Sequence, residues 1–237
     1  MENKNIFFMQ RTRKNKVISI LNDPIPGQGE LQMEPREFDP DRLFFDNNEF
    51  RKLVIIGSFS VGKTSLASRI VHDDFSDSGK ATIGVDQLSV VVELGSRKCT
   101  FQVWDTSGDE RYSDVMSSFY RGAEVVIICY DCTRTDTFQD VDMWKARVDQ
   151  YAHQARIFLV ACKTDMPNKE VSSDAGITKA SSISAEFFEV SAKEKRGVLE
   201  MFQRVAYVAI ALPIHSRKKL ISIDNSAEPL AVKKSKC

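Results

Sequence analysis

Residues 57–64 read Gly57-Ser58-Phe59-Ser60-Val61-Gly62-Lys63-Thr64. The spacing of this stretch is GxxxxGK[ST], and it lies between an apolar run, Lys52–Ile56, and a helical pattern, which is the context this motif requires. The glycines let the backbone turn its N–H groups inward without Cβ clashes, and the following helix adds its positive N-terminal end. The stretch is therefore typical of a loop that binds phosphate groups.

Outward from this loop, short apolar runs alternate with helical patterns, which predicts a parallel α/β sheet. The expected strands are Lys52–Ile56, Gln87–Leu94, Cys99–Asp105, Val125–Asp131, Ile157–Cys162 and Phe187–Val190. The expected helices are Lys63–Val71, Phe138–Tyr151 and Val198–Ala211. Gly95-Ser96 predicts a hairpin turn that makes one strand antiparallel. We expect an α/β fold with a six-stranded, mainly parallel sheet and helices on both faces.

Composition excludes several classes of protein. The 237 residues carry 33 basic and 33 acidic side chains, and 42% are hydrophobic, which is the mix of a folded globular protein. No apolar run approaches the roughly 18 to 20 residues of a membrane-spanning helix. Residues 1–16 carry five basic and one acidic side chains and residues 213–237 six and two, so each end is +4 and the remainder −8. This balance does not indicate nucleic-acid binding.

Composition and sequence periodicity divide the chain into three regions. Residues 1–49 contain scattered prolines and glycines without periodicity, and we expect a disordered N-terminal extension, with a transit peptide as the alternative. Residues 50–212 form the predicted nucleotide-binding domain, and residues 213–237 a flexible basic tail. Cys129 and Cys132 form a lone CxxC, which we interpret as buried thiols rather than half of a zinc site.

Later strand ends separate the classes of phosphate-loop protein. Asp105 ends a strand where it can hold Mg²⁺, and the backbone N–H of Gly108 can contact a γ-phosphate. Asp165, in Cys162-Lys163-Thr164-Asp165, can accept two hydrogen bonds that guanine supplies and adenine does not. Ser191-Ala192-Lys193 closes the last strand, where its backbone could meet guanine O6. Because open α/β sheets bind ligands at these strand ends, the set favours a GTPase over a nucleotide kinase.

On these motifs the chain resembles the Ras-like small GTPases, and within them the Rab branch, over about residues 51–212. The matching segments are GSFSVGKT, TIGVD at residues 82–86, WDTSGDERY, FYRGA at residues 119–123, YDCT at residues 130–133, CKTD and SAK. The resemblance implies a P-loop small GTPase fold that binds GTP or GDP with Mg²⁺ and regulates vesicle trafficking. It also implies effectors that read the switch segments, an exchange factor and an activating protein.

The resemblance also implies residue roles. Lys63 would reach the β- and γ-phosphates, Thr64, Thr82 and Asp105 would hold Mg²⁺, and Phe75 would stack on guanine. The expected nucleotide-binding residues are Ser60, Val61, Gly62, Lys63, Thr64, Ser65, Phe75, Thr82, Gly108, Cys162, Lys163, Asp165, Ser191, Ala192 and Lys193. The expected catalytic residues are Lys63, Thr82 and Asp109.

Three departures from the family pattern fall on its chemistry. Asp109 stands where the family has the glutamine that orients water, and an ionised aspartate only accepts hydrogen bonds. Phe59-Ser60 replaces small residues, so Phe59 would crowd the γ-phosphate and any inserted arginine. Cys162 replaces an asparagine that contacts N7 of the base. We expect guanine-nucleotide binding with faster exchange and slow hydrolysis. The alternative is a catalytically impaired, mostly GTP-bound interaction platform.

Two further features of the sequence bear on function, one beside the predicted site and one in the C-terminal tail. Gly79 stands where many relatives have a tyrosine that covers the nucleotide, so that edge should be open.

The sequence ends in Lys233-Lys234-Ser235-Lys236-Cys237, where one lipid on Cys237 and a basic tail would give the minimum of two membrane signals. We expect a cytoplasmic protein that is peripheral on an intracellular membrane face. The alternative is an unmodified, solvated tail.

Overall fold

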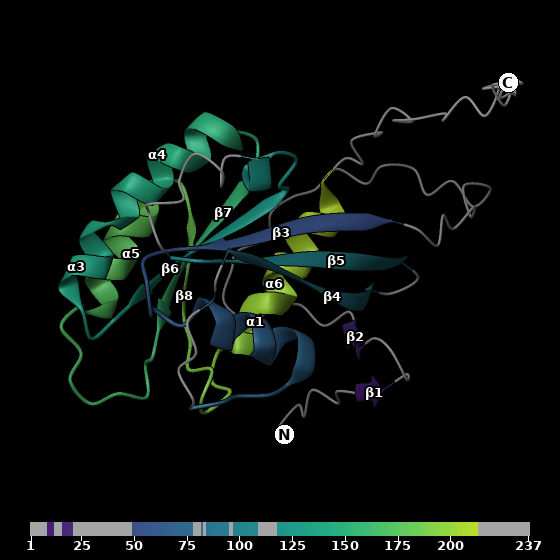
Figure 1. The fold of residues 1–237 in the computed structure, drawn as a ribbon, viewed down its shortest axis with the longest axis horizontal. Helices are drawn as coiled ribbons and strands as arrows, with labels where there is room; N and C mark the ends of the chain where they lie inside the picture. Colours follow the sequence, from purple (N-terminus) through teal and green to yellow (C-terminus); the bar gives the residue numbers. More distant parts are fainter. Residues whose placement is uncertain are drawn as a thin grey trace, which may run out of the picture.

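The fold is a twisted sheet with helices on both faces, as Figure 1 shows. The computed structural model describes residues 9–11, 16–20, 49–77, 82, 84–94, 97–108 and 118–212. In spatial order the strands are β1 (Met9–Arg11), β2 (Lys16–Ile20), β4 (Val85–Leu94), β5 (Arg97–Thr106), β3 (Phe50–Ile56), β6 (Val125–Asp131), β7 (Arg156–Cys162) and β8 (Glu186–Glu189). The helices are α1 (Lys63–His72), α3 (Thr135–Gln139), α4 (Val141–Tyr151), α5 (Ser173–Ser182) and α6 (Val198–Ala211).

The six predicted strands correspond to β4, β5, β3, β6, β7 and β8, which are neighbours in this order within the sheet. β3 pairs in parallel with both β5 and β6, and β7 pairs in parallel with β6 and β8. β4 and β5 are antiparallel, and their register ends with Leu94 opposite Arg97, which confirms the hairpin connection through residues 95–96. Every residue of β6 is buried, as expected of a strand covered on both faces.

Alternate residues of the strands pack on opposite faces of the sheet. Leu53 and Ile55 belong to the hydrophobic cluster that α1 and α6 complete, whereas Val54 and Ile56 belong to the cluster completed by α4 and α5. This alternation follows from the two-residue period of side chains along a strand. In Figure 1, α1 and α6 lie together on one side of the sheet and α3, α4 and α5 on the other.

The helices differ from the prediction at two places. The expected helix Phe138–Tyr151 is two helices, α3 and α4, which meet at Asp140. α5 was not expected from the sequence, because Gly176 and Ala180 are its only fully buried residues and leave a narrow apolar stripe. Its local signal is Ser172, whose hydroxyl accepts a hydrogen bond from the backbone N–H of Ala175 at 3.2 Å, as an N-cap.

Within residues 1–49, where we expected a disordered extension, the structure describes two strands, β1 and β2. β2 pairs in parallel with β4, which places Ile18 opposite Val92, and β1 pairs antiparallel with β2. Ile18 is 2% exposed and packs in the cluster that contains Val90 and Val92. The run Val17-Ile18-Ser19-Ile20 has strong β propensity, but it is too short to predict a strand without the edge of β4 that it covers. The rest of residues 1–48 and the predicted tail, residues 213–237, lie outside the described residues.

The cysteines within the described ranges are buried in the sheet region. Cys99, Cys129, Cys132 and Cys162 are all buried free thiols, which confirms the interpretation of Cys129 and Cys132 as interior residues. Burial raises the pKa of Cys132 to about 11. Within the same ranges, no helix has the length and apolarity needed to cross a membrane.

The edge contact of β2 predicts that the N-terminal segment stabilises the domain. Replacing Ile18 by Ala should lower the free energy of unfolding by about 2 kcal/mol, because a buried branched side chain leaves the core cluster. The midpoint and slope of urea unfolding measure this change. The matched control is Ile177→Ala on α5, since Ile177 is 51% exposed and its loss should change stability by less than about 0.5 kcal/mol. Equal stability of the two variants would contradict a structural role for β2.

Candidate nucleotide-binding site

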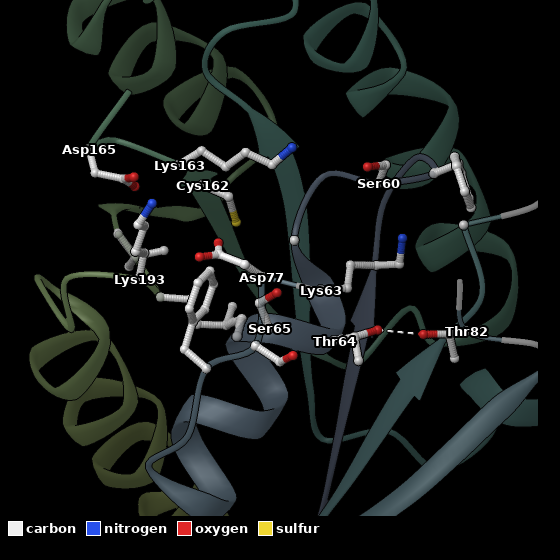
Figure 2. A pocket seen from close by; sticks show the side chains of 18 of the residues that line it. Ser60, Lys63, Thr64, Ser65, Asp77, Thr82, Cys162, Lys163, Asp165 and Lys193 are labelled. Carbon is white, nitrogen blue, oxygen red and sulfur yellow. Dashed lines mark hydrogen bonds between the residues drawn. The ribbon is translucent and has the colours of Figure 1, made fainter. Parts of the chain in front are cut away.

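A pocket of about 400 Å³ opens at the carboxyl ends of the central strands, between the phosphate loop and the loops after β7 and β8. Figure 2 shows that side chains from both ends of the predicted site line it. The lining residues predicted from sequence are Ser60, Gly62, Lys63, Thr64, Ser65, Phe75, Thr82, Gly108, Cys162, Lys163, Asp165, Ala192 and Lys193. The fold therefore brings together segments that are more than one hundred residues apart in the chain.

The path of the phosphate loop depends on two glycines. Gly57 has φ of 138°, and a Cβ there would lie 2.2 Å from the carbonyl oxygen of Cys129 on β6, so no larger residue fits. Gly62 has φ of 109° and directly precedes α1, whose first residue is Lys63. Ser60 also lies in the left-handed region, with φ of 64°, where glycine is less strained. The loop turns sharply between its two glycines and directs the N-terminus of α1 at the pocket.

Lys63 is enclosed by the loop that precedes it. Its side chain is buried, and Nζ donates hydrogen bonds to the carbonyl oxygens of Gly57 at 2.8 Å and Ser58 at 2.7 Å. Burial lowers the pKa of Lys63, although nearby acidic groups, Asp105 among them, oppose the shift. A desolvated ammonium group gains more from a bound anion than an exposed one would. The loop and Lys63 thus form a pocket end suited to phosphate.

Oxygen atoms of three segments converge beside Lys63. The hydroxyls of Thr64 and Thr82 are 2.5 Å apart and face each other in Figure 2. Asp105 is 1% exposed, and its Oδ1 has no hydrogen-bond partner within the described part of the chain. Burial raises the pKa of Asp105, while hydrogen bonds from Thr64 and Thr82 and the charge of Lys63 oppose it. Two hydroxyls and an under-bonded buried carboxylate fit a hard, hydrated cation such as Mg²⁺.

The end of β5 touches the phosphate loop through Gly108. A Cβ on Gly108 would lie 2.5 Å from the backbone nitrogen of Phe59 and 2.6 Å from Nζ of Lys63, so only glycine permits this approach. The backbone N–H of Ser107 donates to the carbonyl oxygen of Gly84 at 2.7 Å. This bond joins the segment after β5 to the segment before β4, which are the two segments predicted to respond to a γ-phosphate.

The opposite end of the pocket holds the carboxylate predicted to read guanine. Oδ1 of Asp165 accepts a hydrogen bond from the Ser191 hydroxyl at 2.7 Å, and Ser191 is completely buried. The backbone N–H of Glu194 donates to the same hydroxyl at 3.0 Å. Nζ of Lys163 pairs with the buried Asp131 at 2.7 Å. The Ser191 hydroxyl, itself held by the N–H of Glu194, orients Asp165 before any base enters, which favours selective recognition.

Cys162 lies in the pocket wall with little polar capacity. Its thiol is 4.0 Å from the carbonyl oxygen of Val160 and contacts the thiol of Cys129, whose pKa is raised well above the usual range mainly by burial. The Cβ of Cys162 would lie 3.7 Å from a Cβ on Gly62, so this wall reaches the phosphate loop. A thiol is a weak donor and a weak acceptor, so the wall lacks the amide that the resemblance predicts at this position.

Several predicted residues do not line the pocket or lie outside the described residues. Val61, Asp105 and Ser191 are buried behind the pocket rather than lining it. The predicted catalytic Asp109 lies outside the described residues, as do Gly79 and Cys237. Sequence reasoning missed lining residues that no motif marks, namely Leu66, Ser76, Asp77, Met166 and Val190. It also gave no role to Thr106, which lies within the WDTSGDERY segment and lines the pocket.

The sequence also did not reveal how the phosphate loop is anchored. The Ser58 hydroxyl donates to Oδ2 of Asp140 at 2.6 Å and accepts from Nε1 of the buried Trp144 at 3.2 Å. Nη1 of Arg134 donates to the carbonyl oxygen of Phe59 at 3.4 Å. The loop is therefore tied to the α3–α4 segment. The Phe59 side chain is 58% exposed and lines the pocket.

Comparison with known proteins shows similarity to the Ras family and to several Ras-related proteins. The family model described as Ras family matches residues 52–210. The Ras-related protein Rab-12 of Mus musculus is 40% identical over 157 residues, which cover 65% of this chain and 65% of that protein. RABD1 of Arabidopsis thaliana is 39% identical over 157 residues, covering 65% and 77%, and SEC4 of Saccharomyces cerevisiae is 36% identical over 178 residues, covering 75% and 82%.

The anchor of the phosphate loop yields a stability prediction. Replacing Ser58 by Ala should lower the free energy of unfolding by about 1 to 2 kcal/mol, because the buried indole N–H of Trp144 loses its acceptor. Urea unfolding measures the loss, and GDP titration should show weaker binding as the loop loosens. Ser181→Ala is the control, since its exposed hydroxyl only bonds the carbonyl oxygen of Ile177 within α5. An S58A protein as stable as S181A would show that the anchor is not stabilising.

Proposed function

We propose that this chain, which belongs to the Rab branch of the Ras family of small GTPases, binds GTP and GDP with Mg²⁺ and regulates vesicle trafficking. The observation that supports this most is the pairing of two prepared ends in one pocket. Lys63 is buried within the phosphate loop at one end, and Asp165 is oriented by Ser191 at the other. A guanine nucleotide carries complementary groups at both ends.

The residues at the phosphate end of the pocket would have different roles. Lys63 and the loop N–H groups would neutralise the β- and γ-phosphates, and Thr64, Thr82 and Asp105 would hold the hydrated cation. Mg²⁺, when bound, supplies positive charge that offsets the negative charge of the phosphates. Thr82 and Gly108 would contact the γ-phosphate, and the bond from Ser107 to Gly84 would transmit its presence to both segments. Loss of the γ-phosphate would then release Thr82–Gly84 and Asp105–Tyr112 together.

Slow intrinsic hydrolysis forms the second part of the proposal. Asp109 is shorter than glutamine and, when ionised, cannot donate to the attacking water; it also adds negative charge beside an anionic transition state. Phe59, which lines the pocket with more than half of its side chain exposed, would crowd the space that an inserted arginine needs. Both features favour a long-lived GTP state.

The alternative function is a catalytically impaired interaction platform that stays mostly GTP-bound. One experiment separates it from a cycling switch: identify the nucleotide in purified full-length protein, then follow single-turnover GTP hydrolysis. Slow but complete conversion to GDP supports the switch, and bound GTP without conversion supports the platform. Hydrolysis at the rate of ordinary small GTPases would contradict the catalytically impaired platform. Failure to bind any guanine nucleotide would overturn both functions.

The proposed partners follow from the same assignment. Effectors would read Thr82–Gly84 and Asp105–Tyr112, and an exchange factor and an activating protein would act on the nucleotide. The basic tail and Cys237 would place the cytoplasmic protein on an intracellular membrane face, with one lipid and one charged segment as the two signals. Nucleic acid is not among the expected partners.

Asp109 should limit the rate of hydrolysis. Replacing Asp109 by Gln should raise the single-turnover rate by about 10-fold or more, since the longer neutral amide can both donate to and accept from water. Asp109→Asn removes the charge but keeps the short side chain, so its rate separates charge from reach. Phosphate release from preloaded GTP is the measurement. The same rate in all three proteins would show that Asp109 does not contribute.

Cys162 should limit the residence time of the nucleotide. Replacing Cys162 by Asn should slow GDP release by roughly 5- to 150-fold, because the amide can restore a buried hydrogen bond to the base. A fluorescent GDP analogue displaced by excess GDP measures the rate. Cys162→Ala is the comparison and should not slow release, since it adds no amide. Unchanged release from C162N would place the base away from this wall.

A further inference from the structure

We infer that Arg69 is a positioning residue for the base end of the pocket, where it holds two walls together and sets how long a guanine nucleotide stays bound. The inference rests on the proposed function and names a residue that does not line the pocket. Arg69 would touch no part of the nucleotide. It would act through the backbone of the two segments that do.

The geometry of Arg69 is that of a buried bridge. It lies on α1, six residues after Lys63, and is 8% exposed. Nε donates to the carbonyl oxygen of Ala192 at 2.8 Å, and Nη1 donates to the carbonyl oxygen of Asp73 at 2.8 Å. Nη1 also lies 3.4 Å from Oδ1 of Asp73. One planar guanidinium therefore bonds two backbone segments that are more than one hundred residues apart.

Both bonded segments lead directly to predicted base contacts. Ala192 belongs to the loop whose backbone would meet guanine O6, and it lines the pocket. Asp73 is the C-cap of α1, with φ of 56°, and the chain leaves the helix there toward Phe75, which also lines the pocket. Fixing the carbonyl groups of Ala192 and Asp73 therefore fixes the spacing between the O6 contact and the stacking ring.

A second tie joins the same two loops at the surface. Nζ of Lys195 pairs with Oδ2 of Asp73 at 2.9 Å, but the Lys195 side chain is 58% exposed. Exposed ion pairs are screened by water and salt and contribute little. Arg69 is the buried member of the two and should carry most of the coupling.

Arginine suits this position better than lysine. The guanidinium presents several N–H groups in a rigid fork, so it can donate to two carbonyl groups that lie in different directions. A lysine ammonium is a point charge on a flexible stem and would satisfy one carbonyl group well at a time. Because α1 also carries Lys63 and Thr64, the bridge connects the base loop to the helix that begins at the phosphate loop.

The first test measures GDP release from full-length protein with Arg69→Met and Arg69→Lys. Met keeps an apolar stem but donates nothing, so release should be about 10-fold faster, with Lys between Met and the unchanged protein. Arg204→Lys is the matched control, since Arg204 is a partly buried arginine on α6 that pairs with Glu186 at 2.7 Å and does not line the pocket. It should release GDP at the unchanged rate.

The second test separates positioning from general loosening. Affinity is measured for GDP, for IDP, which keeps O6 and N1–H but lacks the 2-amino group, and for 2-aminopurine riboside diphosphate, which lacks O6 and the N1–H. The comparison is the ratio of the affinities of the Met variant and the unchanged protein for each nucleotide. If Arg69 positions Ala192 toward O6, the Met variant should lose affinity for GDP and IDP by the same factor and lose much less for the third nucleotide. An equal loss for all three would show that Arg69 does not act through the O6 contact and would overturn the inference.

The two proposals fail in different ways. If the unchanged protein binds no guanine nucleotide, the proposed function is overturned and this inference with it. If the unchanged protein binds GDP while R69M and R69K release it at the same rate, the inference alone is overturned. Urea unfolding of both variants shows whether each is folded, and R69K, which keeps the charge, provides the reading if R69M is unstable.

Discussion

The close approach of two backbones at Gly57 is the constraint on which the site depends. The carbonyl oxygen of Cys129 on β6 occupies the space that a Cβ at residue 57 would need, so the chain can leave β3 there only as glycine. The loop then curls over its own carbonyl groups, and Lys63 donates back into that curve. Gly108 closes the arrangement from the end of β5, again at a distance that excludes a side chain. The phosphate loop can thus approach both β6 and the segment after β5 because Gly57 and Gly108 carry no side chain.

Charge burial explains why this assembly suits a ligand. Lys63 and Asp105 are both buried, and burial shifts their pKa values in opposite directions, each toward the neutral form. Lys63 donates to two backbone carbonyl groups of its own loop, and Asp105 retains an oxygen without a hydrogen-bond partner among the described residues. A phosphate anion and a hydrated cation would satisfy both groups at once. The protein holds this polar arrangement in place with anchors such as the bonds among Ser58, Asp140 and Trp144.

Prediction from sequence succeeded where a pattern was both long and local. β6 and α6 begin and end at the predicted residues, because a continuous apolar run and a sustained apolar stripe each define an element without outside help. α5 was missed because it buries only a narrow stripe, and β2 because its strand exists only beside β4. The same division holds in the site. Residues within motifs, such as Lys63 and Asp165, were predicted, whereas Asp77 and Met166 line the pocket without any motif.

The sequence alone determined the residues on which the proposed chemistry rests: a phosphate loop, oxygen groups proposed to hold a cation, a carboxylate proposed to read guanine, and the departures at Phe59, Asp109 and Cys162. Such signals lie within a few neighbouring residues, where spacing along the chain fixes spacing in space. Only the tertiary structure decided what holds that chemistry in place, including Ser191 on Asp165, Arg69 on Ala192, and Ile18 against β4. These contacts join residues from 26 to more than 100 positions apart, so they exist only once the sheet has brought its strand ends and edges together.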